Sequence, residues 1–90
     1  MNLTIFATST FKKELKKAKK QHKNIELLQK IIISLQTGKQ LSEKYKDHQL
    51  SGNYRKYREC HIESDWLLMY RIENYELQLA RVGSHSELFG

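Results

Sequence analysis

The fold is decided by residues 66–73, WLLMYRIE, whose first five side chains are apolar or aromatic without alternation. A strand that is apolar on both faces is typical of the centre of a sheet that is covered on both sides. Strand-like segments lie on either side of it in the sequence, over 54–62 and over 76–82. The pair Asn74-Tyr75 joins the last two segments in a tight hairpin, although it is not the favoured Asn-Gly pair. The C-terminal half therefore predicts an antiparallel sheet.

The N-terminal half is expected to form one short strand and two helices. Residues 2–6 alternate polar and apolar side chains, and apolar residues then recur at helical spacing over 8–21 and over 24–37. The polar stretch 39–53 is expected to be a long connecting loop, and 84–88 one closing helical turn. The predicted order is β-α-α-β-β-β, an α+β fold in which two helices cover one face of an antiparallel sheet of about four strands.

Length and composition indicate one basic domain. The 90 residues, 39% of them hydrophobic and 29% charged, suffice for a single modest core over 1–90 and leave no room for a cofactor fold such as a doubly wound sheet. Sixteen Lys and Arg against ten Asp and Glu give a formal charge of +6. This excess predicts a polyanionic partner: a nucleic acid, an acidic protein or an anionic membrane surface.

No segment of the sequence is typical of a membrane or exported protein, so a cytoplasmic protein is expected. The apolar runs at 31–33 and 66–70 are far shorter than the roughly 20 residues of a membrane span. Residues 1–6 do not combine a basic region with a long apolar stretch, as a secretion signal does. The single cysteine, Cys60, excludes an internal disulfide and a cysteine-built zinc site, and it suits a reducing compartment.

Proton-transfer groups gather in the C-terminal half. They are His48, Glu59, His61, Asp65 and His85, with Arg81 as a cation among them. Such a set suits phosphodiester cleavage, which needs a base for the nucleophile, an acid for the leaving oxygen and a cation for the charge that develops on phosphate. RNA is the natural substrate because its 2′-hydroxyl is an internal nucleophile, so that no metal or other cofactor is required.

The pattern also assigns a face of the sheet to Arg81. It follows Leu77 and Leu79 at a spacing of two, which places it on the same face as these apolar residues. An arginine there requires an anion, either a carboxylate such as Glu59 or Asp65, or a bound phosphate. With a carboxylate as its partner, Arg81 would be a structural residue. With a bound phosphate, it would be part of a functional site.

Metal binding and cysteine chemistry are disfavoured. His61 and Asp65 are four residues apart, which suits two ligands on a helix, but their segment is predicted to be a strand end and a turn. No His-x-x-x-His pair exists either, so we expect no metal. Cys60 lacks a base beside it, because the adjacent His61 points to the opposite face of a strand. Core packing is the expected role of Cys60.

Cations and aromatic side chains supply candidates for RNA binding. The cations are Lys12, Lys13, Lys16, Arg55 and Arg58, and the aromatic candidates are Trp66 above all, with Tyr54, Tyr57 and Phe89. Cations follow a phosphate backbone, and aromatic rings stack on bases. Each also has an ordinary alternative, since a charged helix face is often merely solvated and strands favour aromatic residues for packing. Composition alone thus leads to a basic α+β domain that binds nucleic acid.

Three segments resemble the YafQ branch of the RelE-like toxins. They are 46–54, KDHQLSGNY; 57–71, YRECHIESDWLLMYR; and 81–90, RVGSHSELFG. The resemblance covers essentially the whole chain and implies the compact α+β fold of these toxins. It implies the toxin half of a type II toxin–antitoxin pair, a small ribonuclease that cuts messenger RNA, typically on the ribosome. It also implies a cognate antitoxin that neutralises the toxin, with operator DNA bound only through the antitoxin complex.

The site positions of that family fall on His48, His61, Asp65, Arg81, His85 and Phe89. The resemblance casts His85 as general acid, and His61 or Asp65 as the base or the group that orients it. Arg81 would brace the phosphate, and Phe89 would position a base or the C-terminal turn. We add Glu59 on chemical grounds alone. Ser64 stands where relatives often carry proline, which loosens the turn that presents Asp65.

Two rivals to an enzyme stay open at this point: a non-catalytic RNA- or ribosome-binding module, and a DNA-binding partner subunit. Pure binding needs Lys and Arg but no proton-transfer groups, so the histidines and carboxylates favour the enzyme. The expected reaction is metal-independent attack of the 2′-hydroxyl on phosphate. Its products are a 2′,3′-cyclic or 3′-phosphate and a 5′-hydroxyl, and its consequence is inhibition of translation.

Overall fold

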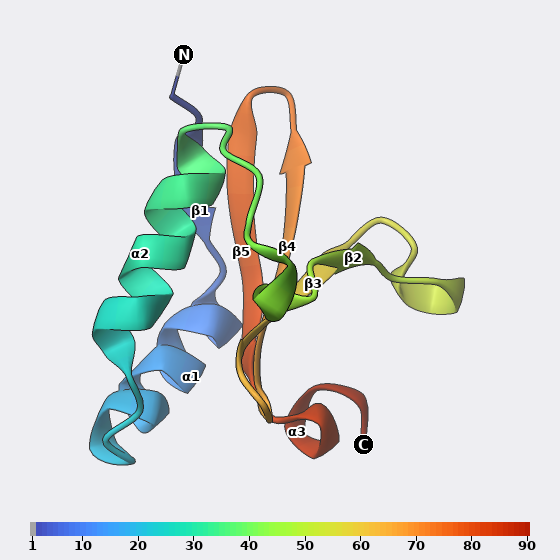
Figure 1. The fold of residues 1–90 in the computed structure, drawn as a ribbon. Coiled ribbons are helices and arrows are strands. Elements are labelled where there is room, and N and C mark those ends of the chain that lie inside the picture. The colour runs from blue at the N-terminus through green and yellow to red at the C-terminus, as the bar shows by residue number, and fades with distance from the viewer. Residues whose placement is uncertain (1) are drawn as a thin grey trace.

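Within residues 2–90, which the computed structural model describes, five strands form one mixed sheet (Figure 1). The strands are β1 (Thr4–Ala7), β2 (His48–Gln49), β3 (Arg58–Glu63), β4 (Trp66–Glu73) and β5 (Glu76–Gly83). Their order across the sheet is β1-β5-β4-β3-β2, so the apolar segment that starts at Trp66 is the central strand, as its pattern predicts. β1 pairs with β5 in parallel, and the other neighbouring strands are antiparallel.

Two helices cover one face of the sheet, and each begins at a side-chain cap (Figure 1). α1 (Ser9–Lys20) follows Thr8 and α2 (Ile25–Gln36) follows Asn24, and each cap accepts a backbone N–H of the first helical turn. The core between helices and sheet includes Phe11, Ala18, Leu28, Ile31, Leu35, Cys60, Ile62, Leu68, Tyr70, Leu77, Leu79 and Val82. In the part of the chain that is described, no helix is long and apolar enough to cross a membrane.

The opposite face of the sheet is covered at one end by the C-terminal helix α3 (His85–Phe89). Leu88 of α3 is buried, and so are Leu67 and Met69 of β4. Gly83 at the end of β5 permits this close approach, because a Cβ atom there would lie 3.1 Å from Glu87 Oε1 and 3.3 Å from Glu87 Cβ. β4 is therefore covered on both faces near its start.

The predicted α+β fold, the order of its elements and the two covering helices are confirmed, while some details differ. The sheet is not wholly antiparallel, because β1 pairs with β5 in parallel. These two strands are far apart in the sequence, so no local sequence pattern could have predicted their pairing. The stretch 39–53 is more than a loop: it contains β2 and a 3₁₀ turn at Glu43–Tyr45, and a second 3₁₀ turn begins there at Gly52–Tyr54. That second turn is why β3 starts at Arg58 rather than at Tyr54.

The hairpin between β4 and β5 turns at Asn74 and Tyr75, as predicted. Both residues have positive φ, 52° and 60°, which is the form of a type I′ turn. Tyr75 is 78% exposed, so its ring adds little packing. The hairpin lies at the end of β4 and β5 remote from α3 (Figure 1).

Candidate active site

A β-bulge in β5 sets the position of Arg81. Tyr70 pairs with Leu79 and Met69 pairs with Arg81, so Ala80 is an extra residue on β5. Arg81 therefore lies on the face opposite to Leu79. The prediction that it shares a face with the leucines before it is wrong, because the alternation rule assumes an unbroken strand.

The bulge brings Arg81 into a row of side chains on the face not covered by α1 and α2. His48 of β2 pairs with Glu59 of β3. Glu59 pairs in turn with Met69 of β4, which pairs with Arg81 of β5. His61 lies two residues beyond Glu59 on β3 and so shares its face. Candidates from three strands thus meet on one surface.

Two histidines share one buried carboxylate. Glu59 is 2% exposed, and its Oε1 lies 3.5 Å from His61 Nε2 and 3.7 Å from His85 Nε2. The ring centroids of His61 and His85 are 5.6 Å apart, and the ring of His48 lies 6.3 Å from that of His61. A buried carboxylate needs a cationic or hydrogen-bonding partner, which these imidazoles supply. The structure thus places Glu59 at the centre of the cluster.

Asp65 holds the start of α3. Its Oδ1 accepts the backbone N–H of His85 at 3.0 Å and lies 3.5 Å from His85 Nδ1. His85 is thereby flanked by Asp65 at Nδ1 and by Glu59 at Nε2. The His85 side chain is 56% exposed, so its ring meets two carboxylates and remains open to a substrate.

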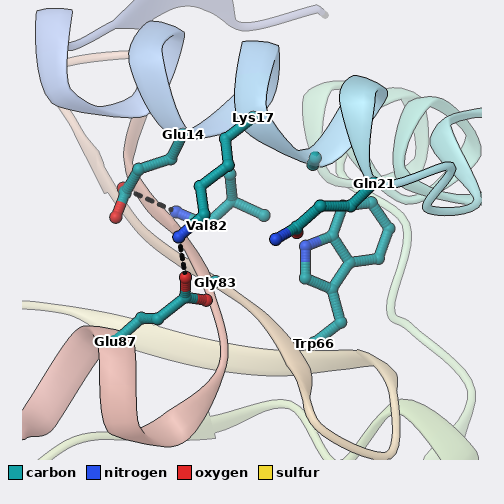
Figure 2. Close-up of a pocket in the computed structure, with 8 residues that line it drawn as sticks. Glu14, Lys17, Gln21, Trp66, Val82, Gly83 and Glu87 are labelled. Carbon is teal, nitrogen blue, oxygen red and sulfur yellow. Dashed lines mark hydrogen bonds and ion pairs between the residues drawn. The ribbon is translucent and has the colours of Figure 1, made fainter.

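Trp66 lines a small cavity between α1 and the sheet rather than a surface for RNA (Figure 2). The cavity of about 60 Å³ is lined by Glu14, Lys17, Ala18, Gln21, Trp66, Val82, Gly83 and Glu87. That volume is far below the roughly 300–1,000 Å³ of a typical ligand pocket. Because Trp66 is only 3% exposed, its ring offers no free face to a base, and the prediction that it stacks on RNA is wrong. The ring serves packing instead.

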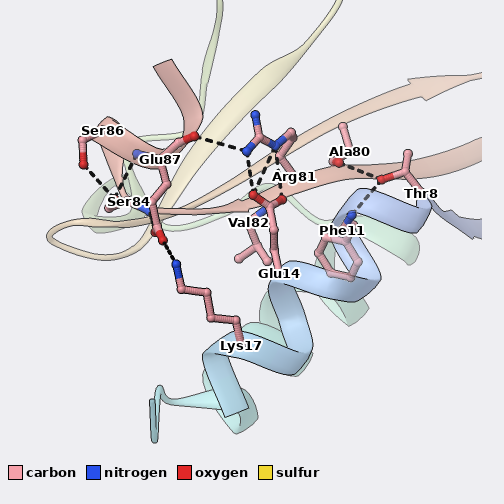
Figure 3. Close-up of polar contacts among 10 residues, drawn as sticks. All are labelled: Thr8, Phe11, Glu14, Lys17, Ala80, Arg81, Val82, Ser84, Ser86 and Glu87. Carbon is pink, nitrogen blue, oxygen red and sulfur yellow. Dashed lines mark hydrogen bonds and ion pairs between the residues drawn. The ribbon is translucent and has the colours of Figure 1, made fainter. Parts of the chain in front are cut away.

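An ion pair ties α1 to α3 (Figures 2 and 3). Lys17 Nζ donates to Glu87 Oε2 at 2.6 Å. Glu87 Oε1 accepts the backbone N–H of Ser84, and Ser84 Oγ accepts that of Glu87, which makes a capping box. The hydrogen bond from Lys17 and then that from the Ser84 backbone lower the pKa of Glu87 to about 2. Glu87 is therefore ionised near neutral pH, and α3 stays anchored there.

Arg81 is held by a carboxylate on α1 (Figure 3). Its Nε donates to both oxygens of Glu14 at 3.2 Å, and its Nη2 donates to Glu14 Oε2 at 2.6 Å and to the Glu87 carbonyl at 3.2 Å. The hydrogen bond to Glu14 raises the pKa of Arg81. The carboxylate expected as the partner of Arg81 was Glu59 or Asp65, and the structure shows Glu14 instead. The one signal for Glu14 in the sequence is that it is the lone acid among the six lysines of α1.

The predicted RNA-binding cations differ in availability. Lys12, Lys13, Lys16 and Arg55 are exposed. Arg58 is half-buried, and its Nη2 donates to Asp47 Oδ2 at 3.2 Å, while the Tyr70 hydroxyl donates to Asp47 Oδ1 at 2.6 Å. These bonds anchor the residue before His48 to the sheet, so Arg58 has a structural partner and the exposed set is free for RNA.

Phe89 and Tyr54 form an aromatic pair beside His85. Their rings meet edge to face with centroids 5.2 Å apart, and they are 37% and 40% exposed. The ring of Phe89 lies 6.1 Å from that of His85. A partly exposed aromatic ring is the kind of group on which a nucleic-acid base can stack.

Glu59, His61 and His85 also form a set able to hold a metal ion. Each offers one ligand atom, and the three atoms lie within 4.8 Å of one another. Imidazole and carboxylate ligands suit Zn²⁺ and Cu²⁺. The expectation of no metal rested on the spacing of ligands along the sequence. Such spacing cannot reveal three ligands that come together from β3 and α3 only in the folded protein. A metal there would occupy one ring nitrogen of each histidine.

Cys60 is fully buried in the core, as predicted. Burial raises the pKa of its thiol to about 12. A thiol of that kind is a poor nucleophile near neutral pH.

Known proteins resemble this chain over almost all of its length. The family described as bacterial toxin of type II toxin-antitoxin system, YafQ, matches residues 3–90. The mRNA interferase toxin YafQ of Escherichia coli strain K12 is 36% identical over 81 residues, which cover 89% of this chain and 88% of the relative.

Solved structures agree with the sequence comparison. A chain of the E. coli DinJ-YafQ toxin-antitoxin complex has a TM-score of 0.92 at 34% identity and covers 100% of both chains. A metal-bound toxin from Helicobacter pylori has a TM-score of 0.91 at 45% identity and covers 97% of this chain and 99% of its own. Fold and sequence therefore point to the same relatives.

Proposed function

Because the chain belongs to the YafQ family of bacterial type II toxins, we propose that it is an endoribonuclease, an mRNA interferase that cuts messenger RNA in the cytoplasm and so inhibits translation. The observation that carries the proposal is the exposed imidazole of His85 between the carboxylates of Glu59 and Asp65. It lies on an open surface, as a polymeric substrate requires.

His85 acts as the general acid. An imidazolium at this position meets a carboxylate at each ring nitrogen, 3.7 Å away at Nε2 and 3.5 Å away at Nδ1. Opposite charges at these distances attract each other, which holds the ring in place. That ring can give its proton to the 5′-oxygen as the bond from oxygen to phosphorus breaks. Asp65, which also binds the backbone of His85, orients the acid.

His48 is our candidate for the base, in place of His61 or Asp65. Its Nδ1 lies 2.6 Å from the carbonyl oxygen of Lys46, and a carbonyl only accepts, so Nδ1 carries the proton. Neutral His48 then has a free lone pair at Nε2, which can take the proton of the 2′-hydroxyl. His61, by contrast, directs its Nε2 at Glu59 Oε1, 3.5 Å away, so that nitrogen faces a carboxylate rather than the substrate. We assign His61 a supporting role, because it contacts Glu59 and its ring lies near those of both His48 and His85.

Arg81 braces the phosphate. Guanidinium N–H groups stabilise the negative charge that builds up on the phosphate oxygens in the transition state. Phe89 and Tyr54 flank the site on the α3 side and would hold a neighbouring base. The reaction needs no metal, because the nucleophile belongs to the RNA.

The cellular partners follow from the family. We propose a cognate antitoxin, which neutralises the toxin as the DinJ-YafQ complex of the E. coli relative suggests, and messenger RNA on the ribosome as substrate. Operator DNA would be bound only through the antitoxin complex. The net charge of +6 suits an acidic antitoxin segment and RNA alike.

The end chemistry of cleaved RNA tests the proposal. Purified protein is incubated with RNA in EDTA, with and without ribosomes, and the fragment ends are identified. We expect 2′,3′-cyclic or 3′-phosphate and 5′-hydroxyl ends. In a parallel reaction without EDTA we expect inhibition by added Zn²⁺ or Cu²⁺, for which Glu59, His61 and His85 would be the ligands. Cleavage that stops in EDTA, or that leaves 5′-phosphates, would contradict the mechanism. Binding without cleavage under all conditions would favour a non-catalytic RNA-binding module.

A further inference from the structure

Arg81 presents only part of its guanidinium to the site. Nε and Nη2 are both bound to Glu14, and Nη2 also reaches the Glu87 carbonyl. Nη1 has no hydrogen-bond partner within residues 2–90, and Figure 3 shows it pointing away from Glu14. A guanidinium held along one edge keeps the N–H groups of its free nitrogen for another anion.

Glu14 is itself fixed. Its Oε1 accepts the backbone N–H of Val82 at 3.2 Å, so the carboxylate binds the backbone of β5 as well as the guanidinium. The side chain of Glu14 is 17% exposed, and α1 is tied to α3 by the pair of Lys17 and Glu87. The anion that holds Arg81 thus belongs to the same rigid element that anchors the helix carrying His85.

We propose that Glu14 is a positioning residue, which orients Arg81 so that Nη1 binds the scissile phosphate while His85 reaches the leaving oxygen. The inference rests on the proposed function and adds to it a residue on the first helix. Without Glu14, the long arginine side chain would sample other rotamers, and the arrangement of cation and acid around one phosphate would be lost for most of the time.

A positioning role has a signature that a binding role lacks. The negative charge of Glu14 weakens the attraction between Arg81 and RNA, so its removal should leave RNA affinity unchanged or tighter. The rate of the chemical step should nevertheless fall, because orientation is lost. A merely structural role would lower the melting temperature and reduce affinity and rate together.

The test compares Glu14→Gln and Glu14→Ala with the parent protein. Gln keeps an oxygen for the Val82 N–H and so protects the fold, and Glu26→Gln on the exposed start of α2 is the matched control. Three quantities are measured: the single-turnover cleavage rate at saturating protein, the affinity for RNA blocked by 2′-O-methyl groups, and the NMR signal of the Arg81 Nε–H group.

We expect Glu14→Ala to cleave about 10-fold more slowly or worse, with blocked RNA bound at least as tightly as by the parent. Glu14→Gln should lie between the two, Glu26→Gln should match the parent, and the Arg81 Nε–H signal should shift in both Glu14 variants. Faster cleavage by Glu14→Ala would mean that Glu14 lowers the cleavage rate of the parent protein, and it would overturn the inference. So would an unchanged rate, or an equal fall in rate and affinity. A parent protein that does not cleave RNA would overturn the proposed function and the inference with it.

Discussion

At the scale of single residues, Glu59 governs the electrostatics of the site. It is buried, and one of its oxygens faces both His61 and His85. Since the carboxylate is removed from water, its attraction for a protonated ring is screened less than at the surface. Glu59 is therefore the charge that both histidine rings face.

The variant Glu59→Gln keeps the volume of this side chain and removes its charge. We expect cleavage to fall by about 10-fold or more, because the ring of His85 loses the charged partner at its Nε2 and is less well oriented. The control is Glu26→Gln, and rates are measured from pH 5 to 9. A profile that superposes on that of the parent would show that Glu59 has no such role.

The sequence allowed the members of the cluster to be named but not their arrangement. His48, His61, Asp65 and His85 lie in recognisable segments, and the structure brings them to one end of the sheet. The orientation of Arg81 was not predictable, because one extra residue in β5 reverses the alternation and nothing local announces a bulge. Glu14 is 67 residues away from its partner, so only the fold reveals the pair.

Among the helices and strands, β4 could be predicted from its local sequence, whereas β2 and the position of α3 could not. The apolar run from Trp66 predicted the central strand, since burial on both faces leaves a plain pattern. The two-residue strand β2 was missed, because two residues show no alternation. The position of α3 depends on Gly83, the capping box and Lys17, a set of contacts from three parts of the chain.

The turn of this hairpin offers a gain in stability. Tyr75 holds a φ of 60° with an exposed side chain, a conformation that glycine adopts without steric cost. We expect Tyr75→Gly to raise the free energy of unfolding by about 0.5–1 kcal/mol and to leave cleavage unchanged. Tyr75→Ala, which keeps the strained backbone, should show no gain. Urea unfolding measures both, and equal stability of the two variants would refute the explanation by backbone strain.

At the scale of the whole molecule, the charge distribution determines how RNA is approached. The six lysines of α1 contribute much of the net charge of +6, and Lys17 connects this helix to the helix that carries His85. A cationic helix beside the site can hold the RNA backbone while the cluster acts on one phosphate.

Salt dependence of RNA affinity tests this arrangement. For Lys13→Gln/Lys16→Gln on α1, we expect weaker binding and a plot of log affinity against log salt that is less steep by about 1.4, or about 0.7 for each lost contact. The matched control Lys30→Gln/Lys39→Gln removes the same charge from other exposed positions. Equal effects of the two pairs would mean that net charge, rather than the α1 surface, attracts RNA.

The central claim is that His85 protonates the departing 5′-oxygen, and a leaving group that needs no proton tests it most directly. Single-turnover cleavage is measured for the parent, His85→Ala and the control His22→Asn, on ordinary RNA and on RNA with sulfur in place of the bridging 5′-oxygen. Asn is chosen for the control because His22 has a φ of 59°. We predict that His85→Ala is about 10²-fold slower than the parent on ordinary RNA and close to the parental rate on the sulfur substrate. A His85→Ala protein that folds and is equally impaired on both substrates, or on neither, would contradict the account.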